Sequence, residues 1–317
     1  MSDLFAETSR PDQALFFSRG DKNDPRLGET VCFEQKDYEK CEIVILGCPQ
    51  DEGVRRNGGR IGAAAAPDAI RAQFYRLTTF NIRKHVFDLG NIHLGNTLEE
   101  THDRHRAIVG QLLRDGKRVI VLGGGNDISY PDGAAMADVF GPEWWIGVNI
   151  DAHLDVRADV PRNSGTPYRQ LLDEGHLIPN YFFEVGFQTH LLSPVYYSYL
   201  RDLGVHRISL ELLRSRADVD LELKETIKLE FIKHSSSLNT FFGFDLDVVR
   251  SADAPGTSAP SPLGLSAGEF ITLVKYASSL ANTRIIEFSE VNPNFDIDNR
   301  TTRLVAIAMH GICSGMP

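Results

Sequence analysis

The sequence is poor in the features that mark secreted, membrane-spanning and nucleic-acid-binding proteins. Its four cysteines, Cys32, Cys41, Cys48 and Cys313, form no CxxC pair and no zinc-like spacing, so we expect reduced thiols in a cytoplasmic protein. No apolar run approaches the roughly 20 residues of a membrane span, and the start of the chain lacks the basic and apolar regions of a secretory signal. With 33 basic against 43 acidic residues the net charge is −10, which argues against a general nucleic-acid binder.

What the sequence does contain is an alternation of apolar strands with helices, without an internal repeat, a low-complexity tract or a clear linker. We expect residues 1–40 to form an irregular N-terminal segment and residues 41–317 a single domain. Near-continuous apolar strands that alternate with helices predict the α/β class, with a mostly parallel sheet in a three-layer α/β/α arrangement. The expected strands are Glu42–Gly47, Arg118–Leu122, Trp145–Ile150, Tyr181–Gly186, Thr240–Phe244 and Arg284–Glu290. The expected helices are Ala63–Leu77, Glu99–Asp115, Pro131–Phe140, Pro194–Leu203, Ser266–Leu280 and Thr301–Cys313.

Polar strings stand where four of these strands end. They are the Gly-rich stretch Gly123–Asp127, the stretch Asp151–Asp155, the stretch Asp245–Asp247, and Glu290. Ligands of open parallel sheets bind beyond the carboxyl ends of the strands, so these strings are expected to meet in one crevice. Carboxylates crowded into one crevice are costly unless cations neutralise them, and a metal site is therefore the leading interpretation.

The residue types in the strings favour a pair of hard divalent ions. Alternate residues of an extended segment share a side, which groups Asp151, His153 and Asp155, and likewise Asp245 and Asp247. Oxygen ligands with one imidazole suit Mn²⁺ or Mg²⁺ better than zinc. Two such ions bind and acidify a bridging water, so the expected reaction is hydrolysis of an electrophilic carbon or phosphorus centre.

Each string has a simpler interpretation when it is taken alone. A single Asp-x-Asp is more often a loop or a helix cap, and three glycines can form a tight turn, although no GxGxxG or GxxxxGK[ST] phosphate loop is present. We interpret His93, His102, His105 and His310 as ordinary polar or packing residues, and Ser251–Pro262 as an active-site loop. Four strings on one edge of one sheet indicate a metal site more strongly than any one of them.

The strings Asp151–Asp155, Phe244–Asp247 and Glu290–Pro293 resemble the signatures of the arginase, agmatinase and formiminoglutamase (ureohydrolase) superfamily. The stretches Asn57–Ala63 and Pro67–Arg71 support the resemblance, which extends over residues 50–310. It implies an arginase-like fold, a centre of two Mn²⁺ ions, and hydrolysis of a C–N bond in a guanidino or formimino group. The implied metal ligands are Asp151, His153, Asp155, Asp245 and Asp247, and Glu290 would bind the cationic amidine-type group.

One implied ligand departs from the usual pattern. Most of the superfamily has a histidine where this chain has Asn126. An amide oxygen is a neutral, weak donor, although Mn²⁺ accepts oxygen ligands readily. Asn126 is also suited to a plain turn after three glycines. We favour the ligand interpretation because the flanking residues are intact, and we expect a more weakly held first ion.

The resemblance also indicates a substrate. The runs Asn163–Leu172 and Asp296–Leu304 look like those of formiminoglutamases, whereas arginase-like chains have asparagine and a proton-shuttling histidine where this chain has Arg157 and Tyr168. The implied reaction is hydrolysis of N-formimino-L-glutamate to L-glutamate and formamide in histidine breakdown. The expected attacking group is a hydroxide that bridges the metal ions.

Roles in this reaction follow for individual residues. Asp247 and Glu290 would be catalytic. Arg157 or Arg169 would grip a carboxylate of the substrate bidentately, unless they extend into solvent. Ser164 and Thr166 would donate hydrogen bonds to the substrate tail.

Two other functions stay open. One is a guanidino hydrolase of the arginase or agmatinase type. The other is a metal-poor pseudoenzyme with a binding role, which Asn126 allows. The resemblance further implies a homo-oligomer, either a trimer or a hexamer, with a small-molecule substrate and neither nucleic-acid nor membrane partners.

Overall fold

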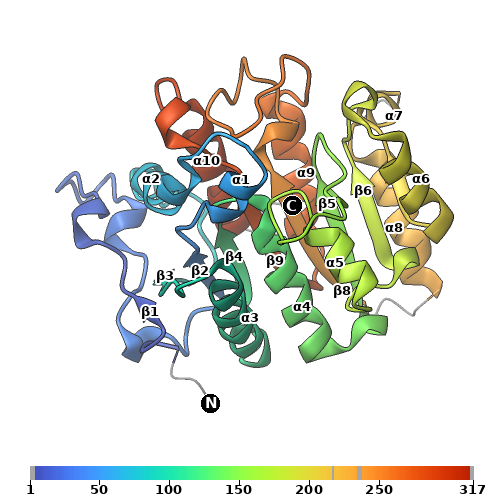
Figure 1. Cartoon of the computed structure of the whole chain (residues 1–317). Coiled ribbons are helices and arrows are strands. Elements are labelled where there is room, and N and C mark those ends of the chain that lie inside the picture. Colours follow the sequence, from blue (N-terminus) through green and yellow to red (C-terminus); the bar gives the residue numbers. More distant parts are fainter. Residues whose placement is uncertain (1–3, 216–217, 234–237, 315–317) are drawn as a thin grey trace.

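The computed structural model describes residues 4–215, 218–233 and 238–314, and a single central sheet organises them (Figure 1). The strands run in the order β1-β3-β2-β4-β9-β8-β5-β6-β7, and all pairs are parallel except β1 with β3. Their bounds are β1 Thr8–Ser9, β2 Ile43–Gly47, β3 Val86–Ile92, β4 Arg118–Leu122, β5 Trp145–Ile150, β6 Phe182–Val185, β7 His206–Ile208, β8 Asn239–Asp245 and β9 Thr283–Ser289.

Helices cover both faces of the sheet, which makes three layers (Figure 1). One face packs against α2, α7, α8, α9 and α10, and the other against α3, α4, α5 and α6. The helices are α1 Glu52–Arg56, α2 Ala66–Phe74, α3 Leu98–Arg114, α4 Ser129–Phe140, α5 Pro167–Asp173, α6 Pro194–Leu203, α7 Leu210–Arg214, α8 Leu221–Lys233, α9 Ala267–Ser279 and α10 Arg300–Ser314.

The two faces have separate apolar cores because side chains alternate across each strand. In β4, Ile120 and Leu122 join the core under α2 and α10, whereas Val119 and Val121 join the core under α3 and α4. Both sets are fully buried, which explains why these strands read as continuous apolar runs.

The fold class is confirmed, and the expected elements agree with the structure to within a few residues. Helix α9 begins at a capping box in which the Ser266 hydroxyl accepts from the Glu269 N–H and the Glu269 carboxylate accepts from the Ser266 N–H. The expected helix from Ala63 begins instead with a short 3-10 turn, and α2 proper ends at Phe74. The sequence analysis missed strands β1, β3 and β7 and the helices α1, α5, α7 and α8. No helix in the described part of the chain is long and apolar enough to cross a membrane.

A buried ion pair ties α2 to the missed strand β3. The guanidinium of Arg71 bonds to both oxygens of Asp88 at 2.8 and 3.0 Å, and neither side chain is exposed to solvent. The Tyr75 hydroxyl donates to the same carboxylate at 2.6 Å, and Arg71 also reaches Asp68 at 3.2 Å. Asp88 is therefore the fully buried carboxylate that neutralises the Arg71 charge, whereas Asp68 is half exposed.

We expect an Asp88→Ala substitution to lower the free energy of unfolding by about 3–5 kcal/mol, because it leaves the Arg71 guanidinium buried without its partner. The matched control is Asp68→Ala, which removes a half-exposed partner of the same arginine and should cost about 1 kcal/mol or less. Urea unfolding midpoints at an unchanged slope measure both effects. Equal losses in the two variants would contradict this assignment.

Candidate metal centre

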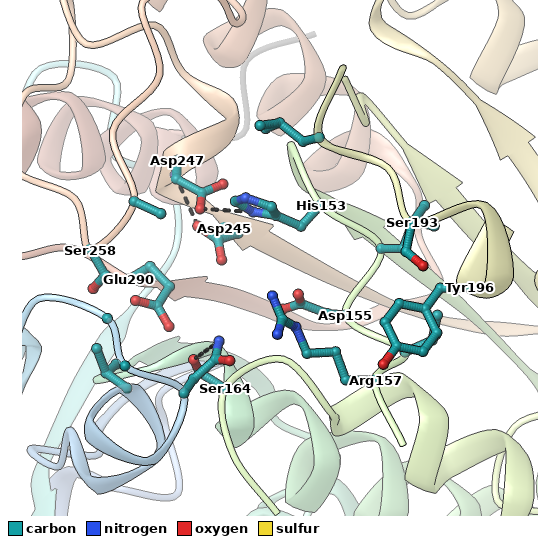
Figure 2. Close-up of a pocket in the computed structure, with 18 of the residues that line it drawn as sticks. His153, Asp155, Arg157, Ser164, Ser193, Tyr196, Asp245, Asp247, Ser258 and Glu290 are labelled. Atoms are coloured by element: carbon teal, nitrogen blue, oxygen red, sulfur yellow. Dashed lines mark hydrogen bonds and ion pairs between the residues drawn. The ribbon is translucent and has the colours of Figure 1, made fainter. Parts of the chain in front are cut away.

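Four neighbouring strands in the middle of the sheet deliver the polar strings to one edge. Strands β4, β9, β8 and β5 lie side by side in that order. Because they are parallel, their carboxyl ends point the same way, and the residues that follow them come together. The expectation that the four strings meet is therefore confirmed. Figure 2 shows residues of three strings around one pocket, and Asn126 of the Gly-rich string bonds to Glu290 and Asp155.

The carboxylates and the imidazole form two groups with metal-ligand spacing. Asp151, His153 and Asp247 make one group, and Asp151, Asp155 and Asp245 make the other, with the ligand atoms of each group within 4.8 Å of one another. The shared Asp151 joins the two groups, as a ligand that bridges two ions would. The Asp151 and Asp245 carboxylates are close enough to hold a common ion, which two-metal hydrolysis requires.

The pKa of His153 reflects the negative charge of the carboxylates in this crevice. Its Nδ1 atom lies 3.1 Å from Asp247 Oδ2 and 3.4 Å from Asp151 Oδ1. The charge of Asp247, together with hydrogen bonds to both aspartates, raises the pKa of His153 to about 12. Without a metal ion, the imidazolium is therefore the cation that offsets part of the acidic charge.

The carboxylates themselves are difficult to ionise together. Burial, followed by repulsion from neighbouring acids, raises the pKa values of Asp155 and Asp245 well above the ordinary carboxyl range. Asp151 differs because the His153 interactions outweigh its burial and lower its pKa. The Asp247 Oδ1 atom is buried without a hydrogen-bond partner among the described residues. A set of buried oxygen ligands that repel one another and include an unpartnered atom suits hard divalent cations.

The three positions after β4 require glycine because neighbouring atoms leave no room for a Cβ atom. A Cβ atom on Gly124 would lie 1.5 Å from the Gln50 carbonyl oxygen, and one on Gly123 would lie 2.2 Å from the Ile128 side chain. None of the three has a positive φ. The turn is therefore a close passage between neighbouring segments, and it sets the position of Asn126 at the start of a short 3-10 turn.

Asn126 lies in the crevice, but its amide nitrogen faces the acidic groups. Nδ2 donates to Asp155 Oδ2 at 2.6 Å and to Asp151 Oδ2 at 3.4 Å. Its Oδ1 atom accepts from the hydroxyls of Ser129 and Ser289, both at 2.9 Å. In this orientation Asn126 offers no lone pair to a cation, because an amide NH₂ group only donates.

Glu290 occupies a strained position beside the cage. Its φ of 60° lies in the left-handed region, as does the 44° of Asp155, and such backbone is uncommon outside glycine. The Glu290 N–H donates to Gly124 O at 2.8 Å, and its Oε1 accepts from the Asn126 N–H at 2.8 Å. Burial raises the pKa of Glu290 to about 8. The two non-glycine residues of the site with strained backbone are thus Asp155, a candidate ligand, and Glu290, whose carboxylate lies beside the ligand groups.

A pocket of about 370 Å³ opens onto these groups and includes some of the expected substrate-binding residues (Figure 2). Arg157 and Ser164 line it, together with Asn57, Tyr196 and Ser258. The Arg157 guanidinium forms no hydrogen bond or ion pair with any described residue. The Ser164 hydroxyl accepts from Asn57 Nδ2 at 3.1 Å.

Two other expected substrate-binding residues lie elsewhere. Thr166 is 1% exposed, and its hydroxyl is bonded to the backbone N–H and carbonyl of Asn163. Arg169 binds Asp173 at 2.6 Å and stacks over the Tyr199 ring at 3.8 Å. Neither residue lines the pocket, so we leave both out of the substrate-binding set proposed below.

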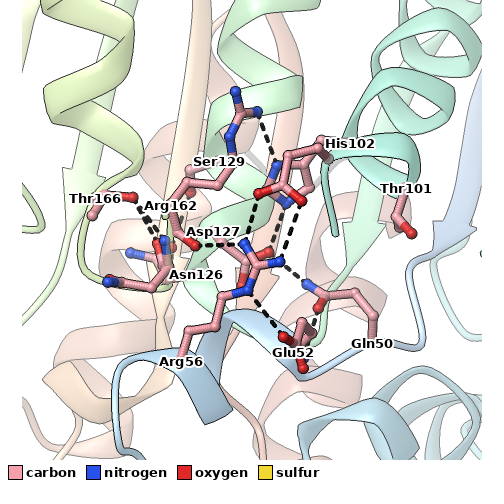
Figure 3. Close-up of polar contacts among 12 residues, drawn as sticks. Gln50, Glu52, Arg56, Thr101, His102, Asn126, Asp127, Ser129, Arg162 and Thr166 are labelled. Carbon is pink, nitrogen blue, oxygen red and sulfur yellow. Dashed lines mark hydrogen bonds and ion pairs between the residues drawn. The ribbon is translucent and has the colours of Figure 1, made fainter. Parts of the chain in front are cut away.

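The sequence analysis missed a polar network under the Gly-rich turn (Figure 3). Asp127 Oδ2 lies 2.7 Å from His102 Nε2 and accepts from Gln50 Nε2 at 2.6 Å. Next to it, His105 Nε2 lies 2.7 Å from Asp132 Oδ1, and both side chains are fully buried. The available signal was the spacing of His102 and His105, which puts two imidazoles on one face of an amphipathic helix. These histidines pair with acids and hold α3 against the metal-site turn and α4.

Comparisons with known proteins agree with this geometry. A family model described as the arginase family matches residues 41–313. The chain is 31% identical over 273 residues to the formimidoylglutamase of Staphylococcus haemolyticus (strain JCSC1435), covering 86% of each chain. It is 33% identical over 300 residues to the formimidoylglutamase of Staphylococcus aureus (strain bovine RF122 / ET3-1), covering 92% of this chain and 94% of that protein.

A solved structure has the same fold as this chain and a sequence identity to it similar to that of the two staphylococcal proteins. The crystal structure of Trypanosoma cruzi formiminoglutamase with Mn²⁺₂ matches at a TM-score of 0.84 and 34% identity, covering 92% of this chain and 98% of that one. The fold, the four strings at one sheet edge and these matches place the chain among metallohydrolases. The chain belongs to the arginase family.

We expect Mn²⁺ to stabilise the protein more at about pH 8 than at about pH 6. Raised pKa values in the folded state, such as about 8 for Glu290 and about 12 for His153, give stability at low pH that is lost as pH rises above the unfolded values of about 4 and 6.5. The metal-free protein should therefore lose several degrees of melting temperature over this interval. The lowered pKa of Asp151 does not change this expectation, because its stabilising effect is already complete above the unfolded value of about 4.

Thermal melting with chelator and with Mn²⁺ at both pH values measures the effect. As the matched control, Asp245→Asn without metal should melt higher than the parent at the upper pH, because one repelling carboxylate is gone. A metal-free melting temperature that rises across the interval would contradict the electrostatic account.

Proposed function

We propose that this protein is a manganese-dependent hydrolase that converts N-formimino-L-glutamate to L-glutamate and formamide. Water supplies the oxygen of formamide, and the bond that breaks joins the formimino carbon to the glutamate nitrogen. The proposal is supported by the similarity to the two staphylococcal formimidoylglutamases and by the Trypanosoma cruzi formiminoglutamase structure with Mn²⁺₂. The ligand groups that share Asp151 support a centre of two ions.

The observation that carries the choice of a substrate with charges of both signs is the lining of the pocket. The acidic cage and Glu290 line it together with Arg157, whose guanidinium has no partner among the described residues (Figure 2). N-formimino-L-glutamate has a cationic amidine at one end and carboxylates on its tail. This ligand offers a complement to each charge, whereas agmatine has no carboxylate for Arg157 to bind. Arginine and guanidinobutyrate also have a carboxylate, so the choice of the formimino compound over them is supported by the similarity to formimidoylglutamases.

Glu290 is the proposed partner of the amidine group. Its Oε1 is held by the Asn126 N–H, and its Oε2 has no hydrogen-bond partner among the described residues. A carboxylate fixed in this way can accept charge-assisted hydrogen bonds from the two formimino N–H groups. Arg157 binds a tail carboxylate, and Ser164, held by Asn57, donates a hydrogen bond to it.

The proposed ligands are Asp151, His153, Asp155, Asp245, Asp247 and Asn126. A bound pair of divalent ions acidifies water and stabilises negative charge that develops at the carbon under attack. Asp247 borders the pocket with a buried Oδ1 atom that has no partner in the described part of the chain. We assign it the transfer of a proton to the leaving glutamate nitrogen, which needs a carboxylate beside the reacting atoms.

The protein is proposed to act in the cytoplasm as a homo-oligomer, a trimer or a hexamer. Support for the compartment comes from the four cysteines, which are all free thiols. Support for the assembly comes from the resemblance alone.

Substrate choice is tested by assaying the Mn²⁺-loaded protein with N-formimino-L-glutamate, arginine, agmatine and guanidinobutyrate. We expect turnover of the formimino compound alone. Turnover of arginine or agmatine in its place would favour the guanidino hydrolase, and a chain that holds no Mn²⁺ after dialysis near pH 8 would favour the pseudoenzyme.

The role of Arg157 is tested by Arg157→Ala. Losing a charge-assisted, bidentate contact should lower kcat/KM by about tenfold to a hundredfold, mainly through KM. Arg169→Ala is the matched control, because its guanidinium is already engaged by Asp173 and Tyr199, and it should keep kcat/KM within about twofold. If Arg157→Ala kept full activity, another group would hold the tail.

A further inference from the structure

The amide of Asn126 lies between two surroundings with different hydrogen-bonding abilities. On the cage side, the carboxylates of Asp151 and Asp155 can only accept. On the other side, the hydroxyls of Ser129 and Ser289 can either donate or accept. All these side chains except Asp155 are fully buried or nearly so, which leaves water little part in the arrangement.

This asymmetry makes both orientations of the amide possible. With NH₂ toward the cage, Nδ2 donates to the carboxylates and Oδ1 accepts from both hydroxyls, which is the arrangement in the structure. With Oδ1 toward the cage, Nδ2 donates to the two hydroxyls, which then act as acceptors. Only the second orientation gives a cation an oxygen ligand, and only amphoteric groups such as hydroxyls permit both.

The surroundings of Ser129 favour its role as an acceptor. Its hydroxyl has one proton, yet it lies within hydrogen-bond distance of both Asn126 Oδ1 and Glu287 Oε1, at 2.9 and 2.7 Å. When that proton goes to Glu287, the Ser129 oxygen is left to accept from Asn126. The Tyr168 hydroxyl also lies beside Ser129 and can fill its second acceptor position.

We propose that Ser129 and Ser289 are positioning residues that let the Asn126 amide turn over, so that its oxygen binds the cation nearest to Asp155. Glu287 supports this orientation by accepting the Ser129 proton. Asn126 then acts as a ligand because the two hydroxyls accept hydrogen bonds from its NH₂ group, which would otherwise face the ions. The inference rests on the two-ion centre of the proposed function, but not on the identity of the substrate.

The proposal is tested by a double-mutant cycle on Mn²⁺ affinity, measured by isothermal titration calorimetry. In the parent, which has Asn126, Ser129→Ala leaves one buried N–H unsatisfied in the metal-bound form only, so one of the two Mn²⁺ ions should bind about tenfold more weakly. In an Asn126→Asp background, both side-chain atoms are oxygens and no turn is needed. In this background, Ser129→Ala removes the same hydrogen bond from the metal-free and the metal-bound form. It should therefore change the Mn²⁺ affinity by less than about threefold.

Internal and matched controls separate orientation from general damage. The ion held by Asp151, His153 and Asp247 should keep its affinity, so the electron paramagnetic resonance spectrum at limiting Mn²⁺ should change from coupled ions to an isolated ion. Ser289→Ala should act in the same direction as Ser129→Ala. Ser314→Ala removes a buried hydroxyl that donates to Gly311 O within α10, its one hydrogen bond among the described residues, and should alter neither ion.

The outcomes distinguish this inference from the proposed function. Equal affinity losses in the parent and in the Asn126→Asp background, or no loss in the parent, would overturn the positioning role while leaving the metal centre in place. A parent protein that binds no Mn²⁺ would overturn both. Two bound ions with no turnover of N-formimino-L-glutamate would overturn only the choice of substrate.

Discussion

Repulsion among carboxylates at one edge of the sheet is the constraint on which the rest of this structure depends. The parallel sheet directs the ends of β4, β9, β8 and β5 to one place, and each end supplies an acid or an amide. The charge of these acids raises the pKa of His153 to about 12, and burial together with their repulsion raises the pKa of Asp245 well above its usual range. This repulsion opposes folding without metal. Because the same carboxylates attract cations, the arrangement becomes favourable when cations occupy it.

The strain at the site is sustained by the layers around it. Asp155 and Glu290 have left-handed backbone, and the glycines after β4 pass within contact distance of neighbouring segments that leave no room for a side chain. These features occur where the central strands are packed on both faces by apolar cores, which hold the strand ends rigidly. The rigid edge positions the candidate ligands, and Arg157, the proposed substrate-binding arginine, lines the pocket beside them.

The spacing of Asp151, His153 and Asp155 grouped these residues from the sequence, on the assumption of an extended segment. The groups form as expected, but the segments are not extended, because Asp155 has left-handed backbone and Asp247 lies in a 3-10 turn. Residues whose partners come from tertiary folding could not be assigned. The Arg169 guanidinium lies over the Tyr199 ring of α6, a contact that the sequence does not indicate. Its local ion pair with Asp173 lies in a helix that the sequence analysis had missed. Strand β3 was missed because its buried Asp88 is neutralised by Arg71 from a preceding helix. The His102–Asp127 contact likewise joins segments 25 residues apart.

As the proposed ligand, Asn126 would show how an amide can serve at a position where the superfamily usually has a histidine. An imidazole presents its lone pair in a direction fixed by the ring, whereas an amide presents either a donor or an acceptor, and its surroundings decide which. Two buried hydroxyls and a glutamate acceptor behind Asn126 provide for both states. In the metal-free protein, the NH₂ group offsets carboxylate repulsion by donating to Asp155. The proposed turn of the amide would exchange one neutralising contact for another, and this competition would weaken the binding of the first ion without abolishing its site.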